Sequence, residues 1–393
     1  MVPNMNTTLF HKIASVVAVA LAALIAGSVV TSTASASQAT RKALVKSIDD
    51  VLAEKNAPPG ISVQITRNGR SQFFGKGKGN LSTGAKPKLN DRFRIASVAK
   101  AYSGAVALSL VRQRKLHLSD TIGEILPGLM PKARNVTLRQ ALHHTGGLPD
   151  YIKQTAFRKA FGSNFSRYFS PRKLISYVRN KNLRHRPGTK YEYSDTDNII
   201  VGLMAAKVTG VSYERLLKRL VYNRTRGGAT SLPRVNAMPR PFLRGYDIDP
   251  PKPPTDISTL INPSGAWASG GIVSTLPNLS SFFSAYVGGK LFGRNIQNAQ
   301  WRFRAGESQP AGPGRNDAGL GLFRYTSKCG VVYGHTGSFP GYRTFAASTA
   351  NGNRTIAYEV NAQVTNTSDF PNAKRISALI RKSYVEAVCH ALG

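Results

Sequence analysis

The chain has 393 residues, enough for one large domain or two closely packed ones. It carries 54 Lys and Arg against 19 Asp and Glu, a formal net charge of +35, which bears on partners and solubility rather than on fold. No run after residue 36 is long and apolar enough to span a bilayer, which excludes a membrane-spanning body for this part of the chain.

The first 36 residues have the pattern of a secretory signal peptide. Lys12 precedes the apolar run IASVVAVALAALIAGSVV, and Ala34-Ser35-Ala36 supplies the small-x-small cleavage pattern directly afterwards. An uncleaved membrane anchor is the alternative, because the run approaches spanning length. The pattern favours a signal peptide over 1–36 and a secreted, extracellular protein.

Export also narrows the choice of partners for this basic chain. Eleven Lys and Arg and no acidic residue lie between Tyr151 and Lys190. An exported protein is not expected to meet nucleic acid, so an anionic cell-wall polymer or cell surface is the expected partner. The alternative is a solvated basic face without a dedicated ligand.

The predicted elements begin with a helix over 44–56 and a hairpin over 61–79 that turns at Asn68-Gly69. A buried helix follows from near Ala96. Helices and Pro- or Gly-rich loops then continue to about residue 275, and another helix starts at 276. Strands return from Gly319, with a second hairpin signal at Asn351-Gly352, and an amphipathic helix closes the chain.

This order predicts an α+β fold in which the two ends of the chain build one antiparallel sheet flanked by helices. The sheet subdomain is expected over roughly 40–95 and 276–393, and a mostly helical subdomain over roughly 96–275. Residues 37–393 therefore form a single functional domain. A cleft between the two parts is the expected ligand site.

Ser97 and Lys100 form the first candidate catalytic pair, at the start of an apolar helix that continues as AVALSLV. Side chains at i and i+3 lie on one helix face, so the Lys100 amine can reach the Ser97 hydroxyl. Burial favours the neutral amine, which can then accept the serine proton. Ser-x-x-Lys occurs by chance about once in a chain of this length. Ser170 and Lys173 repeat it, but Ser170 precedes a Pro and is predicted to be a helix N-cap.

Two further motifs accompany this pair. Tyr193-Ser194-Asp195 follows a Pro-Gly loop, and a phenol near two cations is expected to become anionic enough to relay a proton. The triplet 335–337, His-Thr-Gly, follows a strand, where Gly337 is expected to let a substrate backbone approach closely. An earlier His-Thr-Gly copy at 144–146 runs into Gly147 and Pro149 and is predicted to be a turn.

In this order and spacing, the three motifs resemble those of the serine penicillin-recognising enzymes, which include D-alanyl-D-alanine carboxypeptidases, class C β-lactamases and related esterases. The resemblance covers roughly residues 40–390, extends to LRQALHHTGGLPDY, SGGIVST and SKCGVVYGHTG, and is greatest to the secreted actinobacterial carboxypeptidases. It implies a β-lactamase/transpeptidase-like fold.

The resemblance also implies a role for each matching residue. Ser97 forms the acyl-enzyme, Lys100 takes its proton, and Tyr193 passes a proton to the leaving group. The backbone N–H groups of Ser97 and Ser338 form the oxyanion hole. The substrate-binding set that it implies is Asp195, His335, Thr336, Gly337 and, less directly, Arg324.

Cys329 and Cys389 are the only two cysteines. In an exported chain such a pair is most simply a disulfide, although two buried thiols are the alternative. The corresponding cysteines are bridged in the carboxypeptidases that the chain resembles, which supports the disulfide.

Two positions depart from the family pattern. Asp195 stands where an Asn is usual; an ionised Asp cannot donate to a substrate carbonyl, and beside Lys100 it favours the protonated amine. Phe323 stands where the carboxypeptidases have a carboxylate-binding arginine, and the adjacent Arg324 is expected to point to the other face of its strand. Arg343 is expected to face solvent, with an anion contact as the alternative.

The sequence therefore predicts a monomeric serine hydrolase without metal or cofactor. The preferred function is D-alanyl-D-alanine carboxypeptidase or transpeptidase activity on peptidoglycan peptides, with β-lactam antibiotics as acylating ligands. An esterase, a β-lactamase or another peptide or amide hydrolase of the same chemistry is the alternative for small ester or amide substrates. A catalytically silent cell-wall-binding protein is the alternative from another class.

Overall fold

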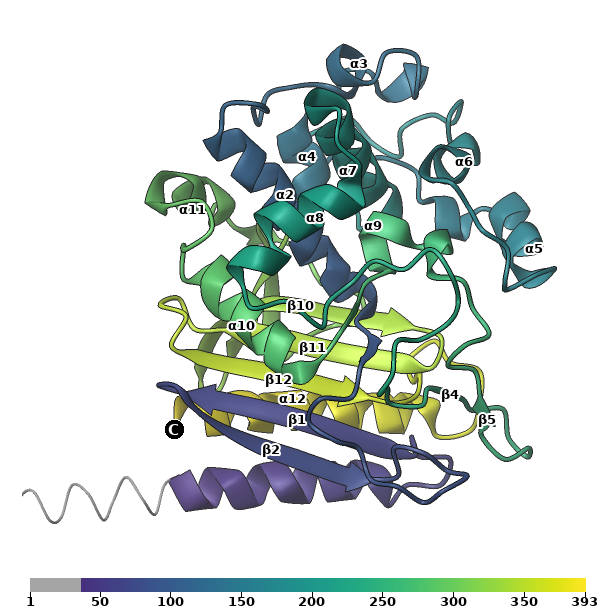
Figure 1. Ribbon diagram of the computed structural model, residues 1–393, viewed down its shortest axis with the longest axis vertical. Helices are drawn as coiled ribbons and strands as arrows, with labels where there is room; N and C mark the ends of the chain where they lie inside the picture. Colours follow the sequence, from purple (N-terminus) through teal and green to yellow (C-terminus); the bar gives the residue numbers. More distant parts are fainter. Residues whose placement is uncertain (1–36) are drawn as a thin grey trace, which may run out of the picture.

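A computed structural model describes residues 37–393, so the expected signal peptide lies outside the described residues. An eight-stranded antiparallel sheet forms its centre, with the order β2-β1-β12-β11-β10-β9-β8-β7 (Figure 1). The strands are β1 (Gly60–Arg67), β2 (Arg70–Gly77), β7 (Arg304–Ala305), β8 (Arg315–Ala318), β9 (Phe323–Ser327), β10 (Gly330–Phe339), β11 (Tyr342–Ser348) and β12 (Arg354–Val360).

The two ends of the chain meet within this sheet, as the sequence predicts, because β1 pairs with β12. The turn between β1 and β2 is Asn68-Gly69, and both residues have positive φ, 48° and 83°. Such a turn matches the twist of two antiparallel strands and favours Asn-Gly. This expectation is confirmed. The short strands β7 and β8 were not predicted.

Helices cover both faces of the sheet. The helix over 37–52 and α12 (Ala373–Leu392) lie on one face, where Ile376, Ile380 and Tyr384 pack with Ile61 and Val63 of β1. α10 (Leu276–Val287) lies on the other face, over β11 and β12, and joins the sheet to the helical region (Figure 1).

The helical region is built around α2, whose residues from Ala99 to Leu110 are all buried. It packs against α7, α8 and α9. Gly104 lets α2 lie close to α10, because a Cβ there would lie 2.6 Å from the hydroxyl of Tyr286. The helices of this region are α2 (Ala99–Arg112), α3 (Ile122–Ile125), α4 (Leu138–Leu142), α5 (Thr155–Gly162), α6 (Pro171–Ser176), α7 (Asp195–Thr209), α8 (Tyr213–Leu220), α9 (Trp267–Gly270) and α11 (Arg294–Gln300).

Short elements complete the region. Two-residue strands pair as β3 with β6 and as β4 with β5. They are β3 (Phe93–Arg94), β4 (Tyr246–Asp247), β5 (Thr255–Asp256) and β6 (Val273–Ser274), and the 3₁₀ turns are η1 (Ala96–Val98), η2 (Pro131–Ala133), η3 (Tyr151–Lys153), η4 (Tyr222–Arg224) and η5 (Pro263–Gly265). Within residues 37–393, no helix has both the length and the apolarity needed to cross a membrane.

A disulfide between Cys329 and Cys389 ties the turn that joins β9 to β10 to the last helix, α12. The two residues are 60 positions apart in the sequence. A cross-link over a loop of this length restricts the unfolded chain and stabilises the fold by roughly 4 kcal/mol in the chain-entropy model. It fastens α12 to the sheet at the end of the strand pair that leads to the candidate site.

Candidate active site

Ser97 lies in the 3₁₀ turn η1, immediately before the buried helix α2. The preceding strand, β3, is held by β6, which fixes the point where the chain enters the turn. Ala96 has a φ of 52°, a left-handed conformation that costs energy for a residue with a side chain. The turn therefore presents the Ser97 hydroxyl in a fixed position at the end of α2.

Lys100 is fully buried one turn above Ser97. Its Nζ donates to Ser97 Oγ at 3.0 Å, to Asp195 Oδ1 at 2.7 Å and to the carbonyl oxygen of Ser269 at 3.0 Å. An ammonium has three N–H bonds, and all three have acceptors here. The structure thus places the Asp195 carboxylate directly on the amine.

The same three contacts also suit the neutral amine. A neutral Lys100 has two N–H bonds, which can remain on Asp195 and Ser269, and one lone pair, which can accept the Ser97 proton. Proton transfer from Ser97 therefore needs no change of partners. Asp195 stabilises the ammonium that forms, although it also favours the charged amine before the reaction.

Tyr193 places its ring centroid 4.9 Å from Lys100 Nζ. Its hydroxyl is buried and has no hydrogen-bond partner among the described residues. Burial, and after it the Asp195 carboxylate, raise the pKa of Tyr193 well above 10, while the nearby Ser97 hydroxyl opposes that shift. The expectation of a phenol made anionic by cations is therefore wrong for the free protein, because burial and carboxylates dominate. Tyr193 is a neutral proton donor.

His144 and Asp197 support Tyr193, and the sequence did not indicate either residue. The His144 ring lies 4.6 Å from the Tyr193 ring, and its Nδ1 is 2.7 Å from Asp197 Oδ2. Both partners are buried, and His144 has a φ of 54°. The predicted turn at 144–146 is thus also a support for the site. Only the repetition of the His-Thr-Gly triplet, at 144–146 and again at 335–337, could have indicated it.

Strand β10 carries the third motif past Ser97. His335 and Thr336 are buried, and the Thr336 hydroxyl donates to the carbonyl of Pro310 rather than to open space. A Cβ on Gly337 would lie 2.6 Å from the Ile95 carbonyl oxygen and 2.9 Å from Ser97 N. Glycine is therefore needed for contact with the nucleophile turn. The expected approach of a substrate backbone to Gly337 stays a prediction.

Arg324 does not line the site, which corrects its assignment as a substrate contact. Its guanidinium donates to Asp317 Oδ2 at 2.9 Å and lies 4.8 Å from the Phe303 ring centroid. Phe323 instead packs on His335, with ring centroids 5.0 Å apart. Strand alternation explains the difference, because consecutive side chains point to opposite faces. Arg343 is buried on Ser377, so the expected solvent-facing position is also wrong.

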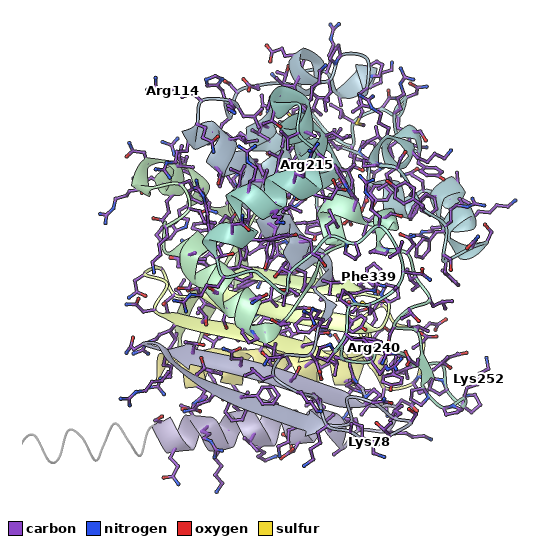
Figure 2. The ribbon with its side chains drawn as sticks, in the orientation of Figure 1. Lys78, Arg114, Arg215, Arg240, Lys252 and Phe339 are labelled. Carbon is purple, nitrogen blue, oxygen red and sulfur yellow. A yellow bond between two sulfur atoms is a disulfide. The ribbon has the colours of Figure 1, made fainter. Side chains whose placement is uncertain are left out.

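A cavity of about 310 Å³ opens beside the nucleophile and brings Ser97, Asp195 and Ser338 together. Its walls are mainly apolar and include Phe339, which is labelled in Figure 2. The aromatic side chains that line it are Tyr151, Phe157, Phe161 and Phe339. Three of the four come from the basic stretch 151–190, where the sequence drew attention to charge alone. Arg158 is the only cation in the lining of this cavity.

Non-glycine residues with left-handed backbones surround the reacting groups. Ala96 precedes the nucleophile, His144 packs on Tyr193, and Trp267, with a φ of 34°, lies two residues before the Ser269 carbonyl that accepts from Lys100. Each such conformation costs roughly 1–3 kcal/mol. Three of the eight non-glycine residues with positive φ in the described chain therefore support the site.

His335 is expected to make the folded protein less stable at acidic pH. Burial, with a smaller effect of Lys100, lowers the pKa of His335 to about 3 from 6.5. Between these two values the unfolded chain binds the proton and the folded chain does not, so stability falls as pH decreases from 6.5 towards 3. We expect a loss of about 1.4 kcal/mol per pH unit from this group.

Urea denaturation of the wild type and of His335→Gln between pH 7 and pH 4 measures this loss. The variant should lose stability less steeply with falling pH. His117→Gln is the matched control, because the His117 side chain is 65% exposed. Equal slopes for the wild type and His335→Gln would contradict the expectation.

The sheet with helices on both faces, and the serine, lysine and tyrosine gathered beside one cavity, define the class of serine acyl-transfer hydrolases. Among the described residues, no group of three or more His, Cys, Asp or Glu could hold a metal ion. A family model described as Beta-lactamase matches residues 48–380. The chain belongs to this beta-lactamase family of serine hydrolases.

Curated relatives match about half of the chain. Protein flp of Staphylococcus aureus is 26% identical over 201 residues, which are 50% of this chain and 39% of the relative. A beta-lactamase of Pseudomonas fluorescens is 26% identical over 206 residues, 52% of this chain and 54% of the relative. The chain thus matches well under two thirds of the length of these relatives.

Solved structures show the same fold over most of the chain. A D-stereospecific amidohydrolase from Streptomyces sp. has a TM-score of 0.73 at 24% identity, covering 86% of this chain and 98% of that protein. D-amino acid amidase from Ochrobactrum anthropi SV3 has a TM-score of 0.76 at 20% identity, with coverage of 89% and 98%. A penicillin binding protein from Bacillus halodurans has a TM-score of 0.70 at 17% identity, with coverage of 86% and 99%.

Proposed function

We propose that this protein hydrolyses amide or peptide bonds through an acyl-enzyme on Ser97. The observation that carries the proposal is the contact of 3.0 Å between Ser97 Oγ and a fully buried Lys100 amine, at the edge of a cavity. A lysine without a role at the site would keep its amine in water, because burial penalises the charged form. The structure provides such a contrast at Ser170, whose Oγ accepts from the backbone N–H of Lys173 as a helix N-cap.

In the proposed reaction, Ser97 Oγ bonds to the substrate carbonyl carbon as Lys100 takes its proton. The backbone N–H groups of Ser97 and Ser338 bind the oxyanion, and Gly337 keeps their two segments in contact. The C–N bond then breaks. Tyr193 donates its proton to the leaving amine and regains one from Lys100. Water attacks the ester, returns a proton to Ser97 through the same groups, and releases the acid.

The lining of the cavity favours a substrate with an apolar or aromatic group next to the reacting carbonyl. Four aromatic side chains line it, whereas Arg158 is its single cation. A substrate of D configuration is part of the proposal, because structural neighbours are a D-stereospecific amidohydrolase and a D-amino acid amidase. Aromatic D-amino acid amides fit this lining better than small peptides.

Carboxypeptidase or transpeptidase action on D-alanyl-D-alanine peptides is the second candidate. It is supported by the motifs and by the structural neighbour that is a penicillin binding protein. Against it, Arg324 is engaged with Asp317, so a terminal carboxylate has only Arg158 as a cation in the cavity. A silent wall-binding protein is disfavoured by the buried Ser97–Lys100 contact.

A labelling experiment followed by a substrate panel tests these proposals. Fluorescent penicillin should label the wild type covalently and Ser170→Ala equally, but not Ser97→Ala. Turnover of D-phenylalanine amide, a D-alanyl-D-alanine peptide, a short ester and a cephalosporin then ranks the substrates. Absence of labelling and of turnover throughout the panel would leave the silent binder. A peptide turned over faster than the aromatic amide would favour the carboxypeptidase.

Export is a further part of the proposal. It is supported by the signal-like residues 1–36 and by the disulfide, since disulfides persist mainly in oxidising compartments. N-terminal sequencing of protein recovered from the culture medium should find Ser37 as the first residue.

Asp195→Asn is expected to raise activity several-fold at neutral pH. The amide oxygen can still accept from Lys100 at the position of Oδ1, now without the charge that favours the ammonium. The amide can also donate to a substrate. The measurement is the pH profile of kcat/KM. A fall in activity throughout the pH range would show that the carboxylate has a catalytic role of its own.

A further inference from the structure

Three cavities outside the active site are lined by arginines. The first, of about 380 Å³, has Arg139, Arg302 and Arg304 in its lining. The second, of about 470 Å³, has Arg112, Arg219 and Arg224. The third, of about 430 Å³, has Arg112, Arg114 and Arg294. We call these eight residues the arginine face.

The three cavities adjoin one another. Arg112, at the end of α2, lines both the second and the third cavity. Helix α11 begins at the third cavity with Arg294 and reaches the first with Ala299. The arginine face therefore continues from the C-terminal end of α2 along α11 to β7.

The charge of this face is not neutralised by the protein. No acidic residue lines any of the three cavities. Within residues 37–393, none of the eight arginines forms an ion pair. Their mutual repulsion is visible at Arg139, whose pKa is lowered by burial and by the charge of Arg302. A cluster of like charges in concave surfaces is complementary to an anionic ligand.

The side-chain chemistry favours an oxyanion that accepts two parallel N–H bonds, and phosphate is such a group. All eight cations are arginines and none is a lysine. The planar guanidinium binds phosphate oxygens in a bidentate manner, which an ammonium cannot do. Because the face extends over three adjoining cavities, it suits a chain of phosphates rather than a single ion.

The aromatic residues on this face argue against nucleic acid. Phe292 is buried and Phe303 is half-buried, and no other aromatic side chain lines the three cavities. Proteins that bind single-stranded nucleic acid stack bases on exposed aromatic rings. A polymer that has phosphates but no bases needs no such ring.

We propose that the arginine face binds a linear phosphate polymer without bases, while the active site remains open. Figure 1 places α11 and the active-site helix α5 on opposite sides of the helical region. Figure 2 labels Arg114 of the arginine face at the upper left edge of the view, away from Phe339 of the catalytic cavity, which lies near the middle. A bound polymer would hold the protein on a polyanionic surface without covering the nucleophile.

The test uses one exposed arginine from each cavity. The triple variant Arg219→Gln, Arg294→Gln, Arg302→Gln removes three charges that have no ion pair within the described residues. Its matched control is Arg167→Gln, Arg172→Gln, Lys190→Gln, which removes three exposed charges from the basic stretch 151–190. The probe is linear inorganic polyphosphate, titrated at several salt concentrations.

We expect the triple variant to bind polyphosphate about tenfold or more weakly and to lower the salt slope of log K by about 2, at roughly 0.7 per lost contact. The control should keep the wild-type slope. Equal losses in both variants would overturn the proposal, because binding would then depend on net charge alone. Tighter binding of single-stranded DNA, or full competition by orthophosphate at equal phosphate concentration, would also overturn it.

Ester turnover measured on the same samples separates this proposal from the proposed function. It should be unchanged in both variants and in the presence of saturating polyphosphate. Inhibition by polyphosphate would contradict the claim that the arginine face is separate from the active site. An absence of turnover throughout the substrate panel, with normal polyphosphate binding, would instead contradict only the hydrolase.

Discussion

Lys100→Met is expected to slow acylation by penicillin and turnover of every substrate by about 10³-fold or more, because the Ser97 proton then has no acceptor. The Ser97 contact of 3.0 Å is one of three that Nζ makes, and methionine, which is one atom shorter and uncharged, makes none of them. The measurement is the rate of covalent labelling with excess fluorescent penicillin.

The matched control is Lys173→Met. Lys173 stands three residues after Ser170, as Lys100 does after Ser97, but its side chain is exposed and lies on the Tyr177 ring. Labelling of this variant should equal that of the wild type. Equal slowing in both variants would contradict the expectation, because it would mean that burial of the amine does not distinguish the two sites.

A double variant separates chemistry from folding. Lys100→Met leaves the Asp195 carboxylate without its cation, which we expect to cost about 3 kcal/mol of stability. Lys100→Met with Asp195→Asn removes the stranded charge, so urea denaturation should show partial recovery of stability. Labelling should remain lost. Recovery of labelling with recovery of stability would contradict the role of Lys100 as the base.

Gly337→Ala is expected to lower the acylation rate by about 10²-fold and to destabilise the protein by about 2 kcal/mol. The added Cβ would lie 2.6 Å from the Ile95 carbonyl oxygen, 2.8 Å from Ala96 Cβ and 2.9 Å from Ser97 N. Two of these atoms belong to the backbone of the nucleophile turn, so β10 or the turn must move. The oxyanion donors at Ser97 and Ser338 then separate.

Gly162→Ala is the control for this substitution. Gly162 ends α5, and a Cβ there meets nothing within 4 Å. It should label at the wild-type rate with unchanged or slightly higher stability. The measurements are labelling kinetics and urea denaturation of both variants. A Gly337→Ala protein with normal labelling would mean that the contact between β10 and the turn does not position the oxyanion hole.

Local patterns in the sequence were sufficient for the first hairpin of the sheet and for the Ser97–Lys100 pair. Asn-Gly marked the first hairpin because few residues accept two consecutive positive φ angles. Ser97 and Lys100 were identifiable because helix spacing fixes which side chains meet. These features depend on neighbours within one turn or one hairpin, and the sequence contains them directly.

Contacts between segments that are distant in the sequence could not be predicted from such local patterns. His144 and Asp197 lie 53 residues apart, and only the packing of α4 against α7 brings them to Tyr193. The sequence predicted an anionic Tyr193 hydroxyl. This prediction was wrong because the burial that keeps the hydroxyl neutral depends on the whole fold. The Arg324 partner, Asp317, lies on β8, a strand that hydrophobic alternation did not reveal.

The left-handed conformations of Ala96, His144 and Trp267 set a limit on how far this protein can be made heat-resistant. Glycine at these positions would relieve the backbone, so selection for survival at high temperature should favour it there. The same glycines would also make three parts of the site more mobile. These are the turn that carries Ser97, the contact of His144 with Tyr193, and the Ser269 carbonyl that accepts from Lys100. Thermostable descendants that carry these glycines should therefore be slower catalysts than their parent.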